Sequence, residues 1–278
     1  MSLNKVKLNC KMCGSYSCQK VCEFLVLRKY KSNLIKCNKC NFNWLSHSER
    51  WLEEAYDESI CITDTGIVSR SIFMSKFAIL FLFFSNTYDK IIDWGAGSGL
   101  FVRLLRDQGF SCIGYEPYGP SQLAAAFCYK KNPLKKNNNY NIVFATEVLE
   151  HINEPRKLMD NILKNTQNLI FTTQLISKNQ NMKKWWYVSN DLGQHISFQS
   201  ERSLQLFCES RNLYYSFNTK LGIHIISKKR YSKMLFRILL GKKRVLILSI
   251  FVSIIQKIIN KNCSVQSDFE ICSKKKKN

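Results

Sequence analysis

Three glycines at alternate positions constrain the fold of this chain more than any other feature. The stretch from Lys90 to Phe101 reads KIIDWGAGSGLF, in which two β-branched residues precede an acid and the glycines follow. Apolar residues then recur at helical spacing, so the pattern predicts a strand, a tight turn and a helix. Glycine lacks a Cβ, so such a turn can adopt positive φ and lie close to a ligand, beside unpaired N–H groups of the helix. The stretch therefore predicts a nucleotide-binding turn.

The spacing of these glycines argues against a dinucleotide. A dinucleotide-binding turn has the pattern G-x-G-x-x-G, whereas this chain has G-x-G-x-G directly after Asp93. At this point the chain resembles the class I S-adenosylmethionine-dependent methyltransferases, whose first motif is acid-x-G-x-G-x-G. The resemblance implies that the methyl donor contacts Asp93, Gly95, Gly97 and Gly99. A glycine-rich turn of an unrelated α/β protein is the alternative.

A second acid follows in the next structural unit. Residues 111–116 read SCIGYE, a short apolar strand that ends in Glu116. This carboxylate lies about 20 residues after the glycines, the offset at which Rossmann-like folds place an acid on the ribose hydroxyls. The resemblance implies the same role toward the ribose of the methyl donor. The alternative is a surface acid at a strand end.

A third motif, EVLEHI, follows the predicted strand Tyr140–Thr146. Ligands of open α/β sheets bind outside the carboxyl ends of the strands, so Glu147, Glu150 and His151 are expected beside the pocket of the glycines. The hexapeptide resembles the motif after the fourth strand of many class I methyltransferases, including the group near the polysaccharide and sugar-modifying enzymes. We therefore assign Glu147 to the donor site and His151 to the acceptor side. A packed or turn-capping histidine is the alternative for His151.

The stretch GQHISFQS, residues 193–200, follows the aromatic run that ends in Tyr187. It is similar to a His-x-Ser-aromatic-x-Ser stretch of zinc-ribbon methyltransferases that act on nucleotide-linked sugars and related metabolites. The resemblance implies that His195 is the general base, a role that suits the pKa of histidine, and that Tyr187 lines the acceptor side. Gln194 stands where the C-methyltransferases of that group tend to have Glu, which leaves O- and C-transfer open. A helix-capping or core-edge role is the alternative for His195.

Cysteine spacing predicts a metal site near the N-terminus. The chain has 12 cysteines, and two C-x-x-C pairs stand on either side of the segment 14–36. Two such pairs can complete a tetrahedral structural Zn²⁺ site, which leaves no open position for chemistry. The residues 21–30 and 42–45 have the apolar content of ribbon strands. A chance pairing, or competition from a C-x₃-C pair at Cys18 and Cys22, is the alternative. The predicted zinc ligands are Cys10, Cys13, Cys37 and Cys40.

Composition limits the class of partner. The residues 1–9 lack the apolar core of a signal peptide, which predicts a reducing, cytoplasmic setting. The formal net charge of +22 fits nucleic acid, anionic membrane or acidic substrates. There is no arginine-rich cluster, RNP-like motif or helix-turn-helix signal, so nucleic acid is not the favoured partner. The charge alone leaves the partner open.

Two apolar stretches raise the question of a membrane. The segment 67–86 has a continuous apolar run far shorter than the ~20 residues of a span, so a core-facing helix is favoured. The segment 234–259 is predicted to form two helices, 234–240 and 245–259, before a lysine tail. Interfacial contact with anionic lipid and packing on the domain or a partner chain are both open for 245–259.

The remaining pattern completes a mostly parallel α/β sheet. We expect helices over 100–108, 120–131, 155–165 and 201–211, strands over 168–173, 213–218 and 222–227 with the last two antiparallel, and a reduced edge after Glu116. The predicted fold class is a Rossmann-like class I methyltransferase sheet with an N-terminal zinc ribbon and a C-terminal helical extension. The predicted domains are a ribbon at 1–48, a methyltransferase domain at 65–230 and an extension at 231–278.

The resemblance implies transfer of a methyl group from S-adenosylmethionine to a small-molecule or glycan acceptor, with a sugar as the nearest expectation and structural Zn²⁺ as the second cofactor. Direct displacement at the sulfonium needs mainly the alignment of donor and acceptor. A methyltransferase that acts on RNA or protein, and a binding protein that keeps the fold without turnover, are the alternatives. The sequence does not give the oligomeric state.

Overall fold

The computed structural model describes residues 8–46, 49–56, 64–136, 139–232, 239, 241–259 and 264–277. The chain divides into two compact units. The first unit comprises residues 1–60, 147–164 and 171–228, and the second comprises 61–146, 165–170 and 229–278. Both units are discontinuous in sequence, and the linear boundaries 1–48, 65–230 and 231–278 stay a prediction.

A seven-stranded sheet has the order β10-β11-β8-β7-β4-β5-β6. The pairs β4–β5, β4–β7 and β5–β6 are parallel, and β10–β11 is antiparallel. This mostly parallel Rossmann-like sheet with flanking helices confirms the predicted fold class. The strands are β4 (Ile91–Trp94), β5 (Cys112–Tyr115), β6 (Cys128–Tyr129), β7 (Tyr140–Thr146), β8 (Thr166–Thr172), β10 (Tyr214–Asn218) and β11 (Ile223–Ser227).

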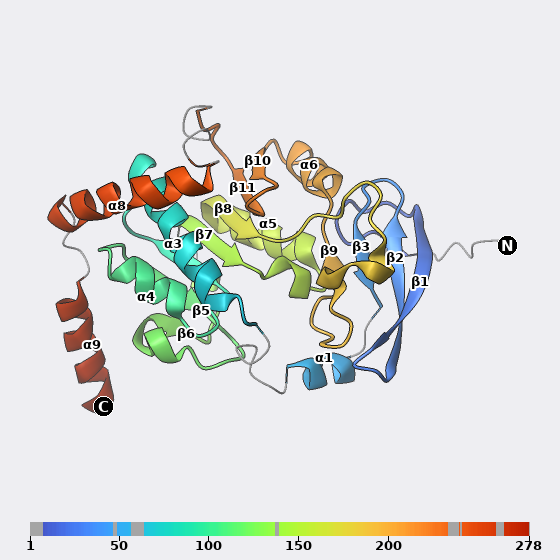
Figure 1. Cartoon of the computed structure of the whole chain (residues 1–278), viewed down its shortest axis with the longest axis horizontal. Coiled ribbons are helices and arrows are strands. Elements are labelled where there is room, and N and C mark those ends of the chain that lie inside the picture. Colours follow the sequence, from blue (N-terminus) through green and yellow to red (C-terminus); the bar gives the residue numbers. More distant parts are fainter. Residues whose placement is uncertain are drawn as a thin grey trace. The chain divides into compact units, whose positions relative to one another are not determined.

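The second unit contains four α-helices among its described residues. They are α3 (Ile67–Phe84), α4 (Leu100–Arg106), α8 (Lys242–Ile259) and α9 (Val265–Lys277). The apolar run of α3 is buried from Phe77 to Leu82, and α8 packs along α3 (Figure 1). By length and composition, α3 is the one helix in the described part of the chain that could cross a membrane. Its buried half fits the predicted core-facing helix.

Helix α9 forms where the sequence analysis expected only a basic tail. The guanidinium of Arg106 on α4 donates to both carboxylate oxygens of Asp268 on α9, at 2.6 and 2.7 Å. Both side chains are buried, and such bidentate charge-assisted pairs are strong and directional. This pair fixes α9 to the end of α4.

The first unit contains a separate four-stranded sheet of order β1-β2-β3-β9. Its strands are β1 (Cys18–Val26), β2 (Tyr30–Cys37), β3 (Asn43–Leu45) and β9 (Ser197–Phe198), and all three pairings are antiparallel. The α-helices of this unit are α1 (Glu49–Ala55), α5 (Pro155–Asn165) and α6 (Glu201–Glu209). A core of buried apolar side chains that includes Trp51, Tyr187 and Phe198 joins the ribbon, α1 and the 176–198 segment.

Two local expectations were wrong. The segment 120–131 forms a 3₁₀-helix, η1 (Gln122–Phe127), and then β6, rather than one α-helix. Ala124 has non-helical torsions and packs against Gly99, and the N–H of Leu123 donates to the carbonyl of Ser98. One backbone bond of this segment therefore goes to the glycine turn, and the kink at Ala124 prevents a continuous α-helix. The two-residue β6 is the reduced edge that the sequence predicted.

The second error concerns the ribbon. The strand expected over 21–30 ends at Val26, because Leu27 and Arg28 adopt positive φ and turn the chain into β2.

The expected helix 234–240 lies largely outside the described residues. The other short 3₁₀-helices are η2 (Pro133–Lys136), η3 (Leu149–His151), η4 (Met182–Lys184) and η5 (Trp186–Val188).

Candidate functional site

The glycine turn of the second unit follows the fully buried strand β4. Gly95, Gly97 and Gly99 all have positive φ, at 75°, 52° and 82°. A Cβ on Gly97 would meet nothing within 4 Å, so the turn faces open space there, whereas a Cβ on Gly99 would lie 2.9 Å from the Cβ of Ala124. The turn thus offers a ligand close access to the backbone at Gly97 and packs tightly at Gly99.

Glu116 lies against this turn. Its Oε2 accepts a hydrogen bond from the N–H of Gly97 at 2.9 Å, and its Oε1 accepts from the N–H groups of Tyr118 and Gly119 at 3.0 and 3.1 Å. A carboxylate has about four acceptor positions, so three N–H groups fix its orientation and leave capacity at Oε2. The arrangement is that of a fixed anionic acceptor beside the glycine turn, as a ribose diol needs.

Asp93 is the buried acid of this region. It lies at 3% exposure on β4 beside β5, where its Cα partner is Gly114. Burial, and then the charge of Glu116, raise the pKa of Asp93 to about 7. A buried carboxylate without a compensating charge is costly, so burial favours the protonated form of Asp93 and raises its pKa.

The first unit holds a second polar cluster, centred on Glu150 in η3. Glu150 is fully buried, and its Oε1 accepts from the hydroxyl of Tyr187 at 2.7 Å. The same hydroxyl lies 3.1 Å from Oγ1 of Thr173. Burial and the neighbouring charge of Glu147 raise the pKa of Glu150. The side chain of Tyr187 is buried, so its hydroxyl positions Glu150.

Two histidines lie beside Glu150. The Nδ1 of His151 is 3.1 Å from the carbonyl oxygen of Gln194, and the Nδ1 of His195 is 2.5 Å from that of Tyr187. The two imidazole rings meet edge to face, with centroids 4.9 Å apart. Burial, and then the neighbouring His195, lower the pKa of His151 to about 3. His151 is therefore neutral in the folded protein at neutral pH.

The backbone at Glu147 is strained. Glu147 directly follows β7, has φ of 52°, and its N–H donates to Oγ1 of Thr172 at 2.9 Å. Positive φ costs energy for a residue with a Cβ, and such strain concentrates at functional sites. The conformation was not predictable from EVLEHI, although the motif itself singled out the residue.

Sequence reasoning missed some members of this cluster. The hydroxyl of Tyr56, at the end of α1, lies 2.9 Å from Nδ1 of His151. Gln194 contributes through its backbone carbonyl, and its side chain donates to the carbonyl of Ala55. Tyr56 lies in an aromatic and acidic stretch without a motif, and no sequence pattern could have paired it with a residue about a hundred positions later.

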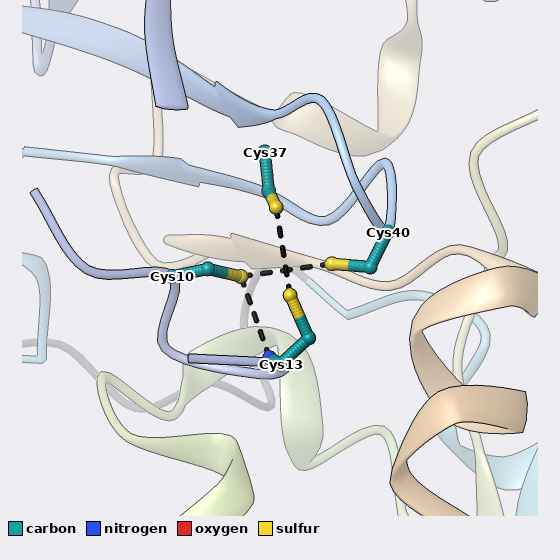
Figure 2. A group of neighbouring side chains, drawn as sticks. All are labelled: Cys10, Cys13, Cys37 and Cys40. Atoms are coloured by element: carbon teal, nitrogen blue, oxygen red, sulfur yellow. Dashed lines mark hydrogen bonds between the residues drawn. The ribbon is translucent and has the colours of Figure 1, made fainter. Parts of the chain in front are cut away.

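The four predicted zinc ligands come together in the first unit. Figure 2 shows the thiols of the two C-x-x-C pairs pointing toward a common centre. Two of the Sγ pairs, Cys10 with Cys40 and Cys13 with Cys37, are 3.6 Å apart. Four sulfurs around Zn²⁺ at about 2.3 Å would be about 3.8 Å apart, so the geometry fits a tetrahedral ion.

The pKa values of these thiols shift in opposite directions. Hydrogen bonding to Cys40 lowers the pKa of Cys10 to about 5, whereas burial raises the pKa of Cys13 to about 11 and hydrogen bonding to Cys10 raises the pKa of Cys40. Neither Cys18 nor Cys22 belongs to the ligand group among the described residues. The competing C-x₃-C pair therefore does not join the site.

Comparison with known proteins agrees with this geometry. A family model described as a methyltransferase domain matches residues 72–215, just over half of the chain. The chain belongs to this methyltransferase family. Comparison with curated proteins finds no match.

One solved methyltransferase structure shares the fold of this chain, and a second is reported beside it. The plantazolicin methyltransferase BpumL in complex with SAH is 13% identical, with a TM-score of 0.51, over 71% of this chain and 89% of that chain. The magnesium protoporphyrin IX methyltransferase ChlM from Synechocystis PCC 6803 with bound SAH is 12% identical, with a TM-score of 0.46, over 65% of this chain and 94% of that chain. At such identities the likeness concerns the fold alone.

Proposed function

We propose that this methyltransferase uses S-adenosylmethionine to methylate a hydroxyl of a small-molecule or glycan acceptor. The observation that carries the donor assignment is the glycine turn with Glu116 fixed against Gly97. In the proposal the open backbone at Gly97 receives the methionine part, and Oε2 of Glu116 accepts from the ribose. The SAH bound in the plantazolicin methyltransferase of similar fold agrees with this assignment.

The histidine cluster of the first unit is the proposed acceptor side. The Tyr187 carbonyl can only accept a hydrogen bond, so Nδ1 of His195 carries the proton and the lone pair is on Nε2. That lone pair can act on the acceptor hydroxyl, which is the general-base role implied by the resemblance. A sugar acceptor is supported only by the sequence resemblance.

The donor site is tested by calorimetric titration of S-adenosylhomocysteine into purified protein whose zinc content has been measured. We expect micromolar binding by the wild type and loss of at least tenfold in affinity for Glu116→Ala. Glu53→Ala changes an exposed carboxylate on α1 and serves as the control with unchanged affinity. A folded wild-type protein that does not bind would overturn the methyltransferase proposal and favour a binding protein that keeps only the fold.

The acceptor class is tested by mass spectrometry of product mixtures from sugars, other small metabolites, RNA and protein. A methylated small molecule or glycan supports the proposal. Methylation of RNA or protein alone would replace it with the macromolecular alternative. Donor binding without any methylated product would favour loss of turnover.

We also propose that helix α8 attaches the enzyme to an anionic lipid surface from the cytoplasmic side. Ser249 and Val252 on α8 are buried, and α8 packs along α3, whereas Ile250, Phe251 and Ile254 are 56%, 60% and 57% exposed. Ile247 and Ile258 extend the exposed apolar stripe at helical spacing. The exposed cations Lys242, Lys243 and Arg244 at its N-terminal end suit an anionic surface.

Sedimentation with phosphatidylcholine vesicles, with and without phosphatidylserine, tests this attachment. We expect binding that needs phosphatidylserine, weakens with salt and falls at least fivefold in the Ile250→Glu/Ile254→Glu variant. Val21→Glu, a similar change at an exposed apolar side chain on β1, should bind like the wild type. Absence of vesicle binding would overturn the proposal, and a dimer lost in the α8 variant would replace the lipid with a second copy of the chain.

A further inference from the structure

We infer that Glu150, His151 and His195 form a binding site for a divalent cation. The acceptor role of this cation rests on the proposed function, whereas cation binding itself does not. One donor atom from each of the three side chains lies within 4.8 Å of the others. Two imidazoles and one carboxylate are a ligand set that holds catalytic Zn²⁺ and other divalent transition metals, with positions left open.

The carboxylate of Glu150 gives an independent reason for a ligand here. Its Oε1 accepts from Tyr187, but its Oε2 is buried and has no hydrogen-bond partner among the described residues. A buried oxygen without a partner is costly and rare in folded proteins. A cation between Glu150 and the two histidines would satisfy this oxygen and offset the charge of the carboxylate.

Hydrogen bonds hold both histidine rings in place. The carbonyl of Tyr187 accepts from Nδ1 of His195, which leaves the lone pair of His195 on Nε2, whereas Nδ1 of His151 contacts both the Gln194 carbonyl and the Tyr56 hydroxyl. Ligating histidines commonly donate their other N–H to a carbonyl in this way, which fixes ring orientation. These contacts orient two neighbouring imidazoles before any ligand binds.

The proposed cation would make the acceptor hydroxyl more acidic. Bound at an open position, the hydroxyl would lose its proton to water, because a metal ion stabilises the oxyanion. The oxyanion then forms a bond to the methyl carbon while the carbon–sulfur bond of the donor breaks and its electron pair returns to sulfur. An acceptor with two adjacent oxygens, such as a vicinal diol, could occupy two open positions. In this arrangement the lone pair of His195 binds the metal, so the cation replaces the general-base role of His195 proposed above and water takes the proton.

Titration with Mn²⁺, followed by the electron paramagnetic resonance signal of the free ion, tests the site without using turnover. Mn²⁺ prefers oxygen and nitrogen ligands, so it does not compete for the thiol cluster. We expect one bound Mn²⁺ per chain, and affinity at least tenfold weaker in Glu150→Gln and in His195→Asn. His195 is only half-buried, so its variant keeps the test open if Glu150→Gln does not fold.

His224→Gln provides the matched control, because His224 is buried in the same unit and both of its ring nitrogens already contact protein oxygens. This variant should bind Mn²⁺ like the wild type. Absence of Mn²⁺ binding by the folded wild type, or equal binding by the cluster variants, would overturn the inference. Titration of the same samples with S-adenosylhomocysteine separates the cation site from the proposed function. Binding of S-adenosylhomocysteine without binding of Mn²⁺ would refute only the cation site. Binding of Mn²⁺ without binding of S-adenosylhomocysteine would refute only the proposed function.

Discussion

The first unit contains two clusters of candidate metal ligands, and they differ in almost every physical respect. The thiol cluster has four soft ligands from two short turns, with sulfurs at the spacing of a closed tetrahedron. The cluster of Glu150, His151 and His195 has three harder ligands, each held by a separate hydrogen bond. A closed site stabilises a fold, whereas an incomplete one can accept a substrate atom. The comparison separates a candidate structural centre from a candidate reaction centre within one unit.

The largest expected effect is loss of the thiol cluster. Cys40→Ser removes a fully buried ligand, and the binding free energy of a structural zinc is of order 10 kcal/mol. We therefore expect the variant to lose zinc and the cooperative unfolding of the β1-β2-β3 sheet, as measured by metal analysis and thermal denaturation. Cys22→Ser, outside the ligand group, should retain both. An unchanged melting temperature in Cys40→Ser would show that the thiols are not a structural centre.

The next effect should appear in turnover. Glu150→Gln keeps the size of the side chain but replaces the carboxylate that would hold the proposed cation, so we expect transfer to an identified acceptor to fall at least about tenfold. The affinity for S-adenosylhomocysteine should stay within about twofold, because the glycine turn is unchanged. Steady-state kinetics and calorimetry measure the two quantities. Equal losses of donor affinity and turnover would contradict a separate acceptor-side role for Glu150.

His224 sharpens the comparison because it is a buried histidine with a structural role. Burial lowers its pKa from the usual 6.5 to about 4, so between these values the unfolded chain binds a proton that the folded protein does not. The contribution of neutral His224 to the free energy of unfolding is therefore fully present above pH 6.5. It decreases as the pH falls toward 4, by at most about 1.4 kcal/mol per pH unit. Denaturant unfolding across this pH range should show that the free energy of unfolding of His224→Gln changes less with pH than that of the wild type. Identical slopes would show that another group dominates.

The smallest effect concerns the helix cap beside the thiol cluster. Ser200 caps α6, accepting from the N–H of Ser203 at 3.0 Å, and its hydroxyl also donates to the carbonyl of Cys40. Ser200→Ala should cost about 1 kcal/mol in the free energy of unfolding. Urea denaturation measures this change, and zinc content should stay the same. Loss of zinc in this variant would mean that the cap supports the thiol turn directly.

Local patterns predicted the parts of the fold that depend on neighbouring residues. The strand Tyr140–Thr146 and the helix beginning at Pro155 lie where a short apolar run and a proline placed them. The glycine turn and the two C-x-x-C pairs were also visible, because each needs particular residues at short spacing. In the structure the glycines adopt positive φ and the four thiols converge.

Contacts between distant segments could not be predicted. Ala124 breaks the expected helix because it packs against Gly99, and nothing in three successive alanines indicates this. In the same way, Tyr56 reaches His151 only through the folding of the first unit. The motif identified the histidine, but the partners that set its orientation come from tertiary structure.

The pairing of β3 with β9 has a consequence for the modularity of the chain. Trp44 is paired with Ser197, and the N–H of Leu45 donates to the carbonyl of Ile196, the residue after His195. The N-terminal ribbon is thus part of the scaffold that supports the histidine segment. Deletion of the ribbon would leave an open strand edge at β9 and remove the backbone support of the histidine segment, so we expect that this chain cannot be shortened to a minimal catalytic core.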